Sequence, residues 1–276
     1  MSQRDERLDA LVASVLASSK YRGVSADMVR EIAARELAKR SSAKEAAKAT
    51  RNKLHQVAGV YLDAKPDYDA WRDELARVAR QGDAEALRAA CRDVMRHHAS
   101  TRERLPILDQ FYATALAGLP PPRRVLDLAC GLNPVALPWL PLAGGAVYTA
   151  YDIYTDLMAF IAGCLETFQR AGVALAQGGA AVRDVLRDPP QEHADLALLL
   201  KAIPCLEQLD PNAGPRLLHA LNARHLLVSY PVHSLGGRGK GMAATYEARF
   251  RAMVSGTPWS IQRFVFPTEL AFLVTK

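Results

Sequence analysis

Short apolar runs that alternate with helical patterns dominate the chain after residue 120, and this alternation constrains the fold most. The runs interpreted as strands are residues 124–129, 147–151, 180–182, 196–200, 225–229 and 270–274. Strands separated by helices form a parallel sheet with helices on its faces. Residues 261–266 lie close to the last run, as an antiparallel pair at a sheet edge would. The sequence therefore predicts an α/β domain.

The first 105 residues show helical spacing instead. Leu8, Leu11 and Val15 recur at the period of an amphipathic helix. Further helices are predicted to begin near Ser25, over residues 43–57, through Trp71 and after Asp83. We predict an all-α domain over residues 1–105 and an α/β domain over residues 106–276. The pattern changes after the prolines at 120–122.

The positive charge of the chain is unevenly placed. The formal net charge is +6, and residues 20–53 contain ten basic side chains against four acidic ones. Such a cluster is typical of a surface that binds a polyanion, although a solvated helix face has the same composition. The domain over residues 106–276 is nearly neutral.

Several classes of protein are disfavoured by composition. No apolar run approaches the roughly 18 residues of a membrane helix, and the N-terminus lacks the order of a signal peptide. We expect a cytoplasmic protein with no membrane contact. The four cysteines are far apart and form no CxxC pair, so we predict buried thiols and neither a disulfide framework nor a metal site.

The loop after the first predicted strand indicates a nucleoside site. That strand leads Asp127 into a tight turn in which Gly131 allows close approach of a ligand. Asp152 follows 21 residues after Gly131, at the end of the next strand, where an acid binds ribose hydroxyls in such folds. The GxGxxG pattern for a pyrophosphate is absent. Adenosine without phosphates fits better, and S-adenosylmethionine is the ligand we predict.

Two further strand ends carry polar side chains. Asp184 is placed to accept from an adenine amino group, although it would serve equally well as a helix cap. Lys201 ends the fourth strand and cannot accept a hydrogen bond from an exocyclic amine. A ring nitrogen such as guanine N7 is the better methyl acceptor for such a site. The alternative is that Lys201 is an ordinary surface lysine after a strand.

Two segments lack a predicted secondary structure. Residues 97–104 contain His97, His98 and two arginines, and Arg104 could bind the carboxylate of a methionine moiety. The paired histidines lack further ligands nearby, so no metal is predicted. Residues 229–242 are rich in glycine and contain Arg238 and Lys240, which favours contact with RNA over a merely flexible loop.

The chain resembles the aminoglycoside-resistance 16S rRNA (guanine(1405)-N(7))-methyltransferases, the Arm family, over essentially its whole length. Motifs that carry the resemblance are residues 19–22, 50–55, 98–104, 127–134, 199–207, 234–242 and 268–270. The resemblance implies an enzyme of class EC 2.1.1. It also implies a class I S-adenosylmethionine-dependent methyltransferase fold, with a Rossmann-like seven-stranded sheet behind a helical extension that docks on the ribosome.

The resemblance also implies roles for individual residues. Cofactor contacts are expected at Tyr61, His98, Ala99, Ser100, Arg104, Asp127, Ala129, Gly131, Asp152, Asp184, Val185 and Leu200. The target base is expected near Lys201, Glu207, Met242 and Glu269, with no general base required. Contacts with rRNA are expected at Lys20, Arg22, Arg51, Lys53, His55, Arg238 and Lys240.

By this resemblance the expected reaction is methylation of guanine N7 in the 16S rRNA of the 30S subunit, by a monomer without metal. Such a methyl group would confer resistance to 4,6-disubstituted deoxystreptamines. Two alternatives stay open. One is an adenine-N1 methyltransferase of the decoding site, and the other is a non-catalytic ribosome-binding protein that retains the cofactor fold.

Overall fold

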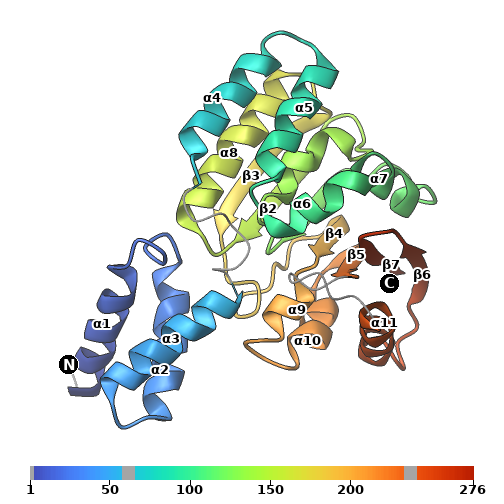
Figure 1. The fold of residues 1–276 in the computed structure, drawn as a ribbon. Helices are drawn as coiled ribbons and strands as arrows, with labels where there is room; N and C mark the ends of the chain where they lie inside the picture. The colour runs from blue at the N-terminus through green and yellow to red at the C-terminus, as the bar shows by residue number, and fades with distance from the viewer. Residues whose placement is uncertain (1–2, 58–65, 233–240) are drawn as a thin grey trace.

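A seven-stranded sheet forms the centre of the α/β part of the protein (Figure 1). The computed structural model describes residues 3–57, 66–232 and 241–276. The strand order is β3-β2-β1-β4-β5-β7-β6, in which β7 runs antiparallel to both of its neighbours and the other pairs are parallel. The strands are β1 (Arg124–Leu128), β2 (Ala146–Asp152), β3 (Leu175–Val182), β4 (Ala194–Leu200), β5 (Ala223–Pro231), β6 (Ser260–Val265) and β7 (Glu269–Thr275). The predicted α/β fold and its antiparallel edge pair are confirmed.

Helices cover both faces of this sheet, which is why its central strands are apolar on both sides. One face packs against α4 (Tyr68–Ala79), α5 (Ala84–Met95), α7 (Leu108–Leu116), α8 (Thr155–Arg170) and the 3-10 turn η2 (Asn133–Trp139). The other face packs against α10 (Ala213–Ala220) and α11 (Met242–Met253). Alternate residues of the central strands therefore enter two separate apolar clusters, as Val125 and Leu126 of β1 do.

The first three helices form a small bundle of their own. They are α1 (Gln3–Leu16), α2 (Ala26–Ala38) and α3 (Ala43–Val57). Their apolar faces share one cluster that includes Val15, Val29 and Leu54, all fully buried. Figure 1 shows this bundle beside the sheet, while α4 and α5 lie against α8.

This packing divides the helices of residues 1–105 between two apolar clusters. The apolar side chains of α4 and α5, such as Leu75 and Cys91, belong to the cluster that covers the sheet. The change in packing partner therefore falls between α3 and α4. Helical periodicity identified these helices but carries no information about which surface they cover.

Aspartate side chains explain where α4 and α5 begin. Asp83 accepts hydrogen bonds from the N–H groups of Glu85 and Ala86 at 2.9 and 3.1 Å, and Asp67 accepts from Ala70 at 3.1 Å. Residues 99–104, which had no predicted structure, form the short helix α6 (Ala99–Arg104), followed by the 3-10 turn η1 (Leu105–Ile107). Among the described residues, no helix is long and apolar enough to cross a membrane.

Candidate active site

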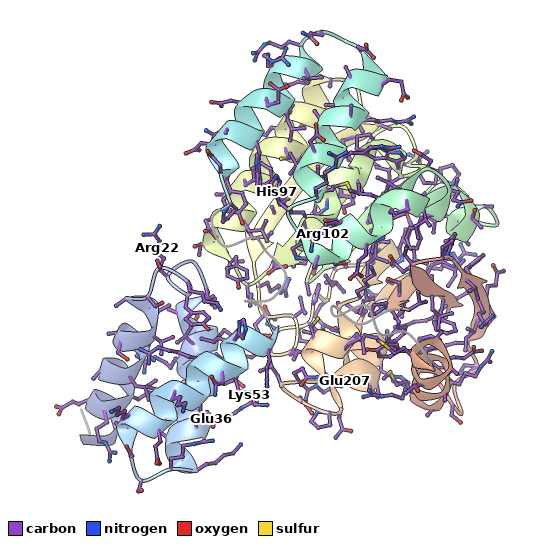
Figure 2. The ribbon with its side chains drawn as sticks, viewed as in Figure 1. Arg22, Glu36, Lys53, His97, Arg102 and Glu207 are labelled. Carbon is purple, nitrogen blue, oxygen red and sulfur yellow. The ribbon has the colours of Figure 1, made fainter. Side chains whose placement is uncertain are left out.

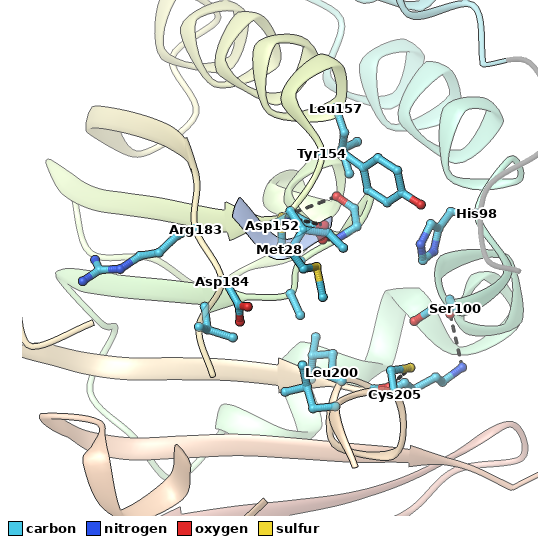
Figure 3. A pocket seen from close by; sticks show the side chains of 18 of the residues that line it. Met28, His98, Ser100, Asp152, Tyr154, Leu157, Arg183, Asp184, Leu200 and Cys205 are labelled. Atoms are coloured by element: carbon cyan, nitrogen blue, oxygen red, sulfur yellow. Dashed lines mark hydrogen bonds between the residues drawn. The ribbon is translucent and has the colours of Figure 1, made fainter. Parts of the chain in front are cut away.

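A pocket lies at the carboxyl ends of β1, β2, β3 and β4, between the sheet, α6 and α2 (Figure 3). The predicted cofactor residues that line it are His98, Ser100, Ala129, Gly131, Asp152, Asp184, Val185 and Leu200, and Lys201 joins them. Parallel strands bring their carboxyl ends to one edge, so residues far apart in sequence meet there. The site was predictable for this reason.

The turn after β1 has an unusual backbone. Ala129 and Gly131 both have positive φ angles, of 49° and 52°. The N–H of Gly131 donates to Asp152 Oδ2 at 2.8 Å, which joins the turn to the end of β2. A Cβ atom at position 131 would lie 2.7 Å from His98 Nε2, so only glycine lets the His98 ring approach the turn.

The Asp152 carboxylate reaches the pocket at the end of β2, and its contact with a ribose stays a prediction. Its side chain lines the pocket, and its second oxygen accepts from the N–H of Ile153 at 2.7 Å. Burial raises the pKa of this carboxyl, and the backbone N–H groups of Gly131, Ile153 and Tyr154 oppose that rise. Each oxygen keeps acceptor capacity for a hydroxyl group of a bound nucleoside.

The position of Asp184 is compatible with both predicted roles, an adenine contact and a cap. It lines the pocket, and its Oδ1 also accepts from the N–H of Leu186 at 3.0 Å, which caps the turn after β3. Burial raises the pKa of this carboxyl, partly opposed by N–H donors of Leu186 and Arg187. Acting as a cap fixes the direction of the side chain, and the carboxylate keeps further acceptor capacity.

Asp127 lies in a layer behind the pocket. It is fully buried, and its Oδ2 accepts from Asn133 Nδ2 at 2.8 Å and from the Tyr148 hydroxyl at 2.6 Å. Its Oδ1 is buried without a hydrogen-bond partner among the described residues. Burial raises the pKa of Asp127 to about 7, against the lowering effect of Tyr148 and Asn133. A buried unsatisfied acceptor of this kind suits the cationic end of a ligand.

Arg104 is also one layer deeper than predicted. Its guanidinium is fully buried and forms an ion pair with Glu269 at 2.8 Å, while Nη1 donates to Asn133 Oδ1 at 2.6 Å. Its face lies over the Phe111 ring, 4.9 Å from the ring centre. The guanidinium therefore organises the polar layer behind Gly131, and direct contact with a cofactor carboxylate stays a prediction.

Glu269 lies deeper than expected for a residue near the target base, so contact with the base stays a prediction. It is fully buried at the start of β7 and accepts from Arg104 and from the Ser229 hydroxyl. Burial opposes its ionisation, but Arg104 and Lys201 outweigh that effect and lower the pKa of Glu269. The sequence motif identified the residue without showing its depth.

Lys201 has a strained backbone at the edge of the pocket. Its φ is +59°, and with Ala129 it is one of two described non-glycine residues with positive φ, both of which line this pocket. Such strain is concentrated at functional sites. Its Nζ donates to Glu103 at 2.7 Å and to the carbonyl of Ser100 at 3.2 Å, so it fixes α6 against β4.

Glu207 and Met242 lie outside the pocket lining. Glu207 follows the short helix α9 (Ile203–Leu206), and its carboxylate pairs with Arg249 of α11 at 2.6 Å. Burial raises the pKa of Glu207, and Arg249 opposes the rise. Met242 begins α11 directly after the glycine-rich segment.

Ala99 is buried in the first turn of α6, while Tyr61, Arg238 and Lys240 lie outside the described residues.

The predicted rRNA contacts gather on the small bundle. Lys20, Arg22 and His55 are exposed, and Figure 2 shows Arg22 pointing away from the molecule. Lys20 Nζ lies 2.8 Å from His55 Nδ1, so the two motif residues are neighbours. Arg51 donates to the carbonyl of Ser14 at 2.9 Å, and Lys53 donates to the carbonyl of Gln208 at 3.1 Å. Lys53 thereby joins the bundle to the loop after α9.

Several residues of the pocket were missed by sequence reasoning. They are Met28, Cys130, Ile153, Tyr154, Leu157, Arg183, Ala202, Cys205, Leu206 and Leu209. Most flank a predicted residue by one or two positions and could have been found from that spacing. Met28 could not, because it lies on α2 of the bundle, far away in sequence.

The residues present fit S-adenosylmethionine. An acid lies at the end of β2, apolar side chains such as Met28, Val185 and Leu200 line the same pocket, and a buried carboxylate without a full set of partners lies behind the turn after β1. The described residues contain no group of three or more His, Cys, Asp or Glu side chains that could hold a metal ion.

The strand order and the acid at the end of β2 define the class I methyltransferase fold. Within this class, the chain belongs to the family described as Ribosomal RNA methyltransferase (FmrO), which matches residues 17–273.

Relatives match this chain over nearly their full length. A 16S rRNA (guanine(1405)-N(7))-methyltransferase of Micromonospora echinospora is 37% identical over 100% of this chain and 99% of its own length. One from Serratia marcescens is 36% identical over 97% and 98%. The crystal structure of the 16S rRNA methyltransferase RmtF in complex with S-adenosyl-L-homocysteine superposes with a TM-score of 0.80 at 31% identity, covering 100% and 99% of the two chains.

Proposed function

We propose that this protein transfers a methyl group from S-adenosylmethionine to N7 of the guanine in 16S rRNA that its relatives' names specify. The observation that carries the proposal is the pocket at the sheet edge, with Asp152 bonded to the Gly131 turn. The proposal is supported by the agreement between this geometry and the activity that the names of full-length relatives state. The substrate we propose is the assembled 30S subunit, with naked 16S rRNA a poor one.

The main task of the protein in this reaction is to position the methyl donor and the target base. S-adenosylmethionine supplies an electrophilic methyl group. Guanine N7 has a lone pair and no proton, so no general base is required. Asp152 binds the ribose, and Lys201 holds α6 against β4 so that the pocket keeps its shape. Catalysis then depends on in-line positioning of the methyl group and the ring nitrogen.

The consequence for the cell follows from the product. A methyl group at N7 adds bulk and a positive charge to the decoding-site guanine. Both oppose binding of cationic 4,6-disubstituted deoxystreptamines such as gentamicin and kanamycin. Expression in a susceptible strain should therefore give resistance to these drugs and not to apramycin, which the adenine-N1 alternative would confer.

The direct test locates the methyl group. Purified protein, 30S subunits and isotope-labelled S-adenosylmethionine are incubated, and the 16S rRNA is analysed by mass spectrometry and primer extension. We expect one new methyl group at the stated guanine with the wild-type protein and at least about a tenfold loss with Asp152→Ala. Absence of a methyl group with the wild-type protein would refute the proposal, and a methyl group on a neighbouring adenine would favour the alternative.

A further inference from the structure

The bundle contributes a side chain to the cofactor pocket. Met28, on α2, is 5% exposed and lines the pocket together with Asp152, Tyr154 and Asp184. Figure 3 shows it between Asp152 and Asp184, on the side of the pocket opposite His98. A flexible thioether side chain suits contact with an aromatic base. The pocket is thus incomplete without the bundle.

A backbone bridge holds the bundle at this position. Val24 pairs with Tyr154 as an isolated antiparallel bridge. The N–H of Ser25 donates to the carbonyl of Ile153 at 2.8 Å, and the N–H of Thr155 donates to the carbonyl of Gly23 at 2.8 Å. Ile153 and Tyr154 directly follow Asp152 and line the pocket themselves. The bridge therefore joins the bundle to the residues that would carry the ribose.

The bridge also adjoins the basic surface. Lys20 and Arg22, both exposed, come just before Gly23 in the chain. Gly23 packs closely against the start of α8, because a Cβ atom there would lie 2.8 Å from the Asp156 carboxylate. Ile153 and Tyr154 pack in return against the apolar cluster of the bundle. A displacement of the loop that bears Lys20 and Arg22 would therefore move the wall of the pocket.

We propose that the segment from Gly23 to Met28 couples the two binding events of this protein. Met28 contacts the nucleoside part of S-adenosylmethionine, and the bridge to residues 153–155 makes cosubstrate binding and docking on 30S subunits mutually favourable. This inference rests on the proposed function. Coupling between two sites is reciprocal, so each ligand tightens the other by the same factor.

The first measurement is the affinity of the fluorescently labelled protein for 30S subunits, with and without saturating S-adenosylhomocysteine. We expect binding at least about fivefold tighter with S-adenosylhomocysteine present, within the usual range of such couplings. Equal affinities would overturn the proposal. If the wild-type protein binds neither ligand, the proposed function fails; if it binds both independently, only the coupling fails.

Ser25 offers a matched pair of variants for the bridge. The φ of Ser25, −48°, is close to the value that a proline ring imposes. Ser25→Pro therefore removes the N–H that donates to Ile153 and changes the backbone conformation little. Ser25→Ala keeps that donor, and the serine side chain makes no hydrogen bond to the first turn of α2, which the structure describes throughout. The coupling factor should fall to near one in Ser25→Pro and persist in Ser25→Ala. Coupling that persists in a folded Ser25→Pro would overturn the bridge as its route.

Met28 tests the pocket wall independently. Met28→Ala should weaken binding of S-adenosylhomocysteine to the isolated protein by about five- to tenfold in calorimetry, whereas Met28→Leu keeps most of the apolar area and should stay within about twofold. Thermal unfolding of both variants shows whether the bundle is intact. If Ser25→Pro does not fold, the wild-type comparison and this pair still decide the proposal. Unchanged affinity in a folded Met28→Ala variant would remove Met28 from the site.

Discussion

At the scale of single residues, Asp127 links the stability of the fold to the chemistry of the pocket. It is fully buried, two donors satisfy one of its oxygens, and its other oxygen has no partner among the described residues. Burial raises its pKa to about 7. A carboxyl group that titrates near neutrality makes the stability of the fold depend on pH in this range.

Stability should therefore fall as pH rises through this titration. The folded-state pKa of Asp127, about 7, lies above the ordinary aspartate value of 3.8. Between these values the folded state holds a proton that the unfolded state has lost, so stability present at low pH is lost as pH approaches 7. Asp127→Asn cannot ionise and should lack this loss, so relative to wild type it should gain roughly 3 kcal/mol between pH 5 and pH 8.

Urea unfolding of both proteins at the two pH values measures the difference directly. The exposed Asp93→Asn, whose carboxylate forms a surface pair with Arg96, serves as the control and should follow the wild-type profile. Parallel profiles for wild type and Asp127→Asn would show that Asp127 is ionised across this range.

At the scale of elements, one buried ion pair fastens α6 to β7. Arg104 ends α6, Glu269 begins β7, and neither has any exposed side-chain surface. Lys201, at the end of β4, lies 3.4 Å from the same carboxylate. Three elements around the pocket thus share one negative charge, so its removal leaves buried positive charge without compensation.

Glu269→Gln should accordingly destabilise the protein strongly. The expected loss is about 3 kcal/mol in the free energy of unfolding, as for other buried pairs broken on one side. Glu166→Gln removes a carboxylate from an exposed pair with Arg170 and should leave the unfolding midpoint almost unchanged. Denaturant titration of the two variants beside wild type makes the comparison, and a loss below 1 kcal/mol for Glu269→Gln would contradict this account of the site.

The same elements show how far the sequence could predict this fold. The apolar runs predicted the strands because a buried parallel sheet needs continuous apolar residues. Their carboxyl ends then predicted Gly131, Asp152 and Lys201 as neighbours. The burial of individual side chains could not be predicted in this way. A motif singles out Glu269 but does not show that the residue is buried at the start of β7. Packing partners were equally hidden, as α4, α5 and Met28 demonstrate.

At the scale of the whole molecule, the bundle has two faces, to which the proposed function assigns different tasks. Its exposed face presents Lys20, Arg22 and His55, and its apolar face closes the pocket through Met28. The positive excess of residues 20–53 can therefore serve rRNA docking without entering the methyl-transfer site. Charge on the exposed face should control affinity for 30S subunits, and the apolar face should control the shape of the pocket.

Charge reversal separates these tasks. Replacing Lys20, Arg22 and Arg51 together with Glu should abolish measurable binding to 30S subunits yet leave the affinity of the isolated protein for S-adenosylmethionine within about twofold, because phosphate contacts dominate nucleic-acid affinity. The control replaces Arg123, Arg124 and Arg224 together with Glu. These arginines are exposed at the amino ends of β1 and β5, away from the pocket.

The control has the same change in net charge and should retain most of the affinity for 30S subunits. Each lost phosphate contact should also reduce the slope of log affinity against log salt by roughly 0.7 to 0.9. Arg51 donates to the carbonyl of Ser14, so thermal unfolding must first show that the triple variant is folded. Equal losses in the two triple variants would mean that net charge, and not the face of the bundle, directs docking. A parallel loss of S-adenosylmethionine affinity in the folded bundle variant would mean that its two faces are not separate.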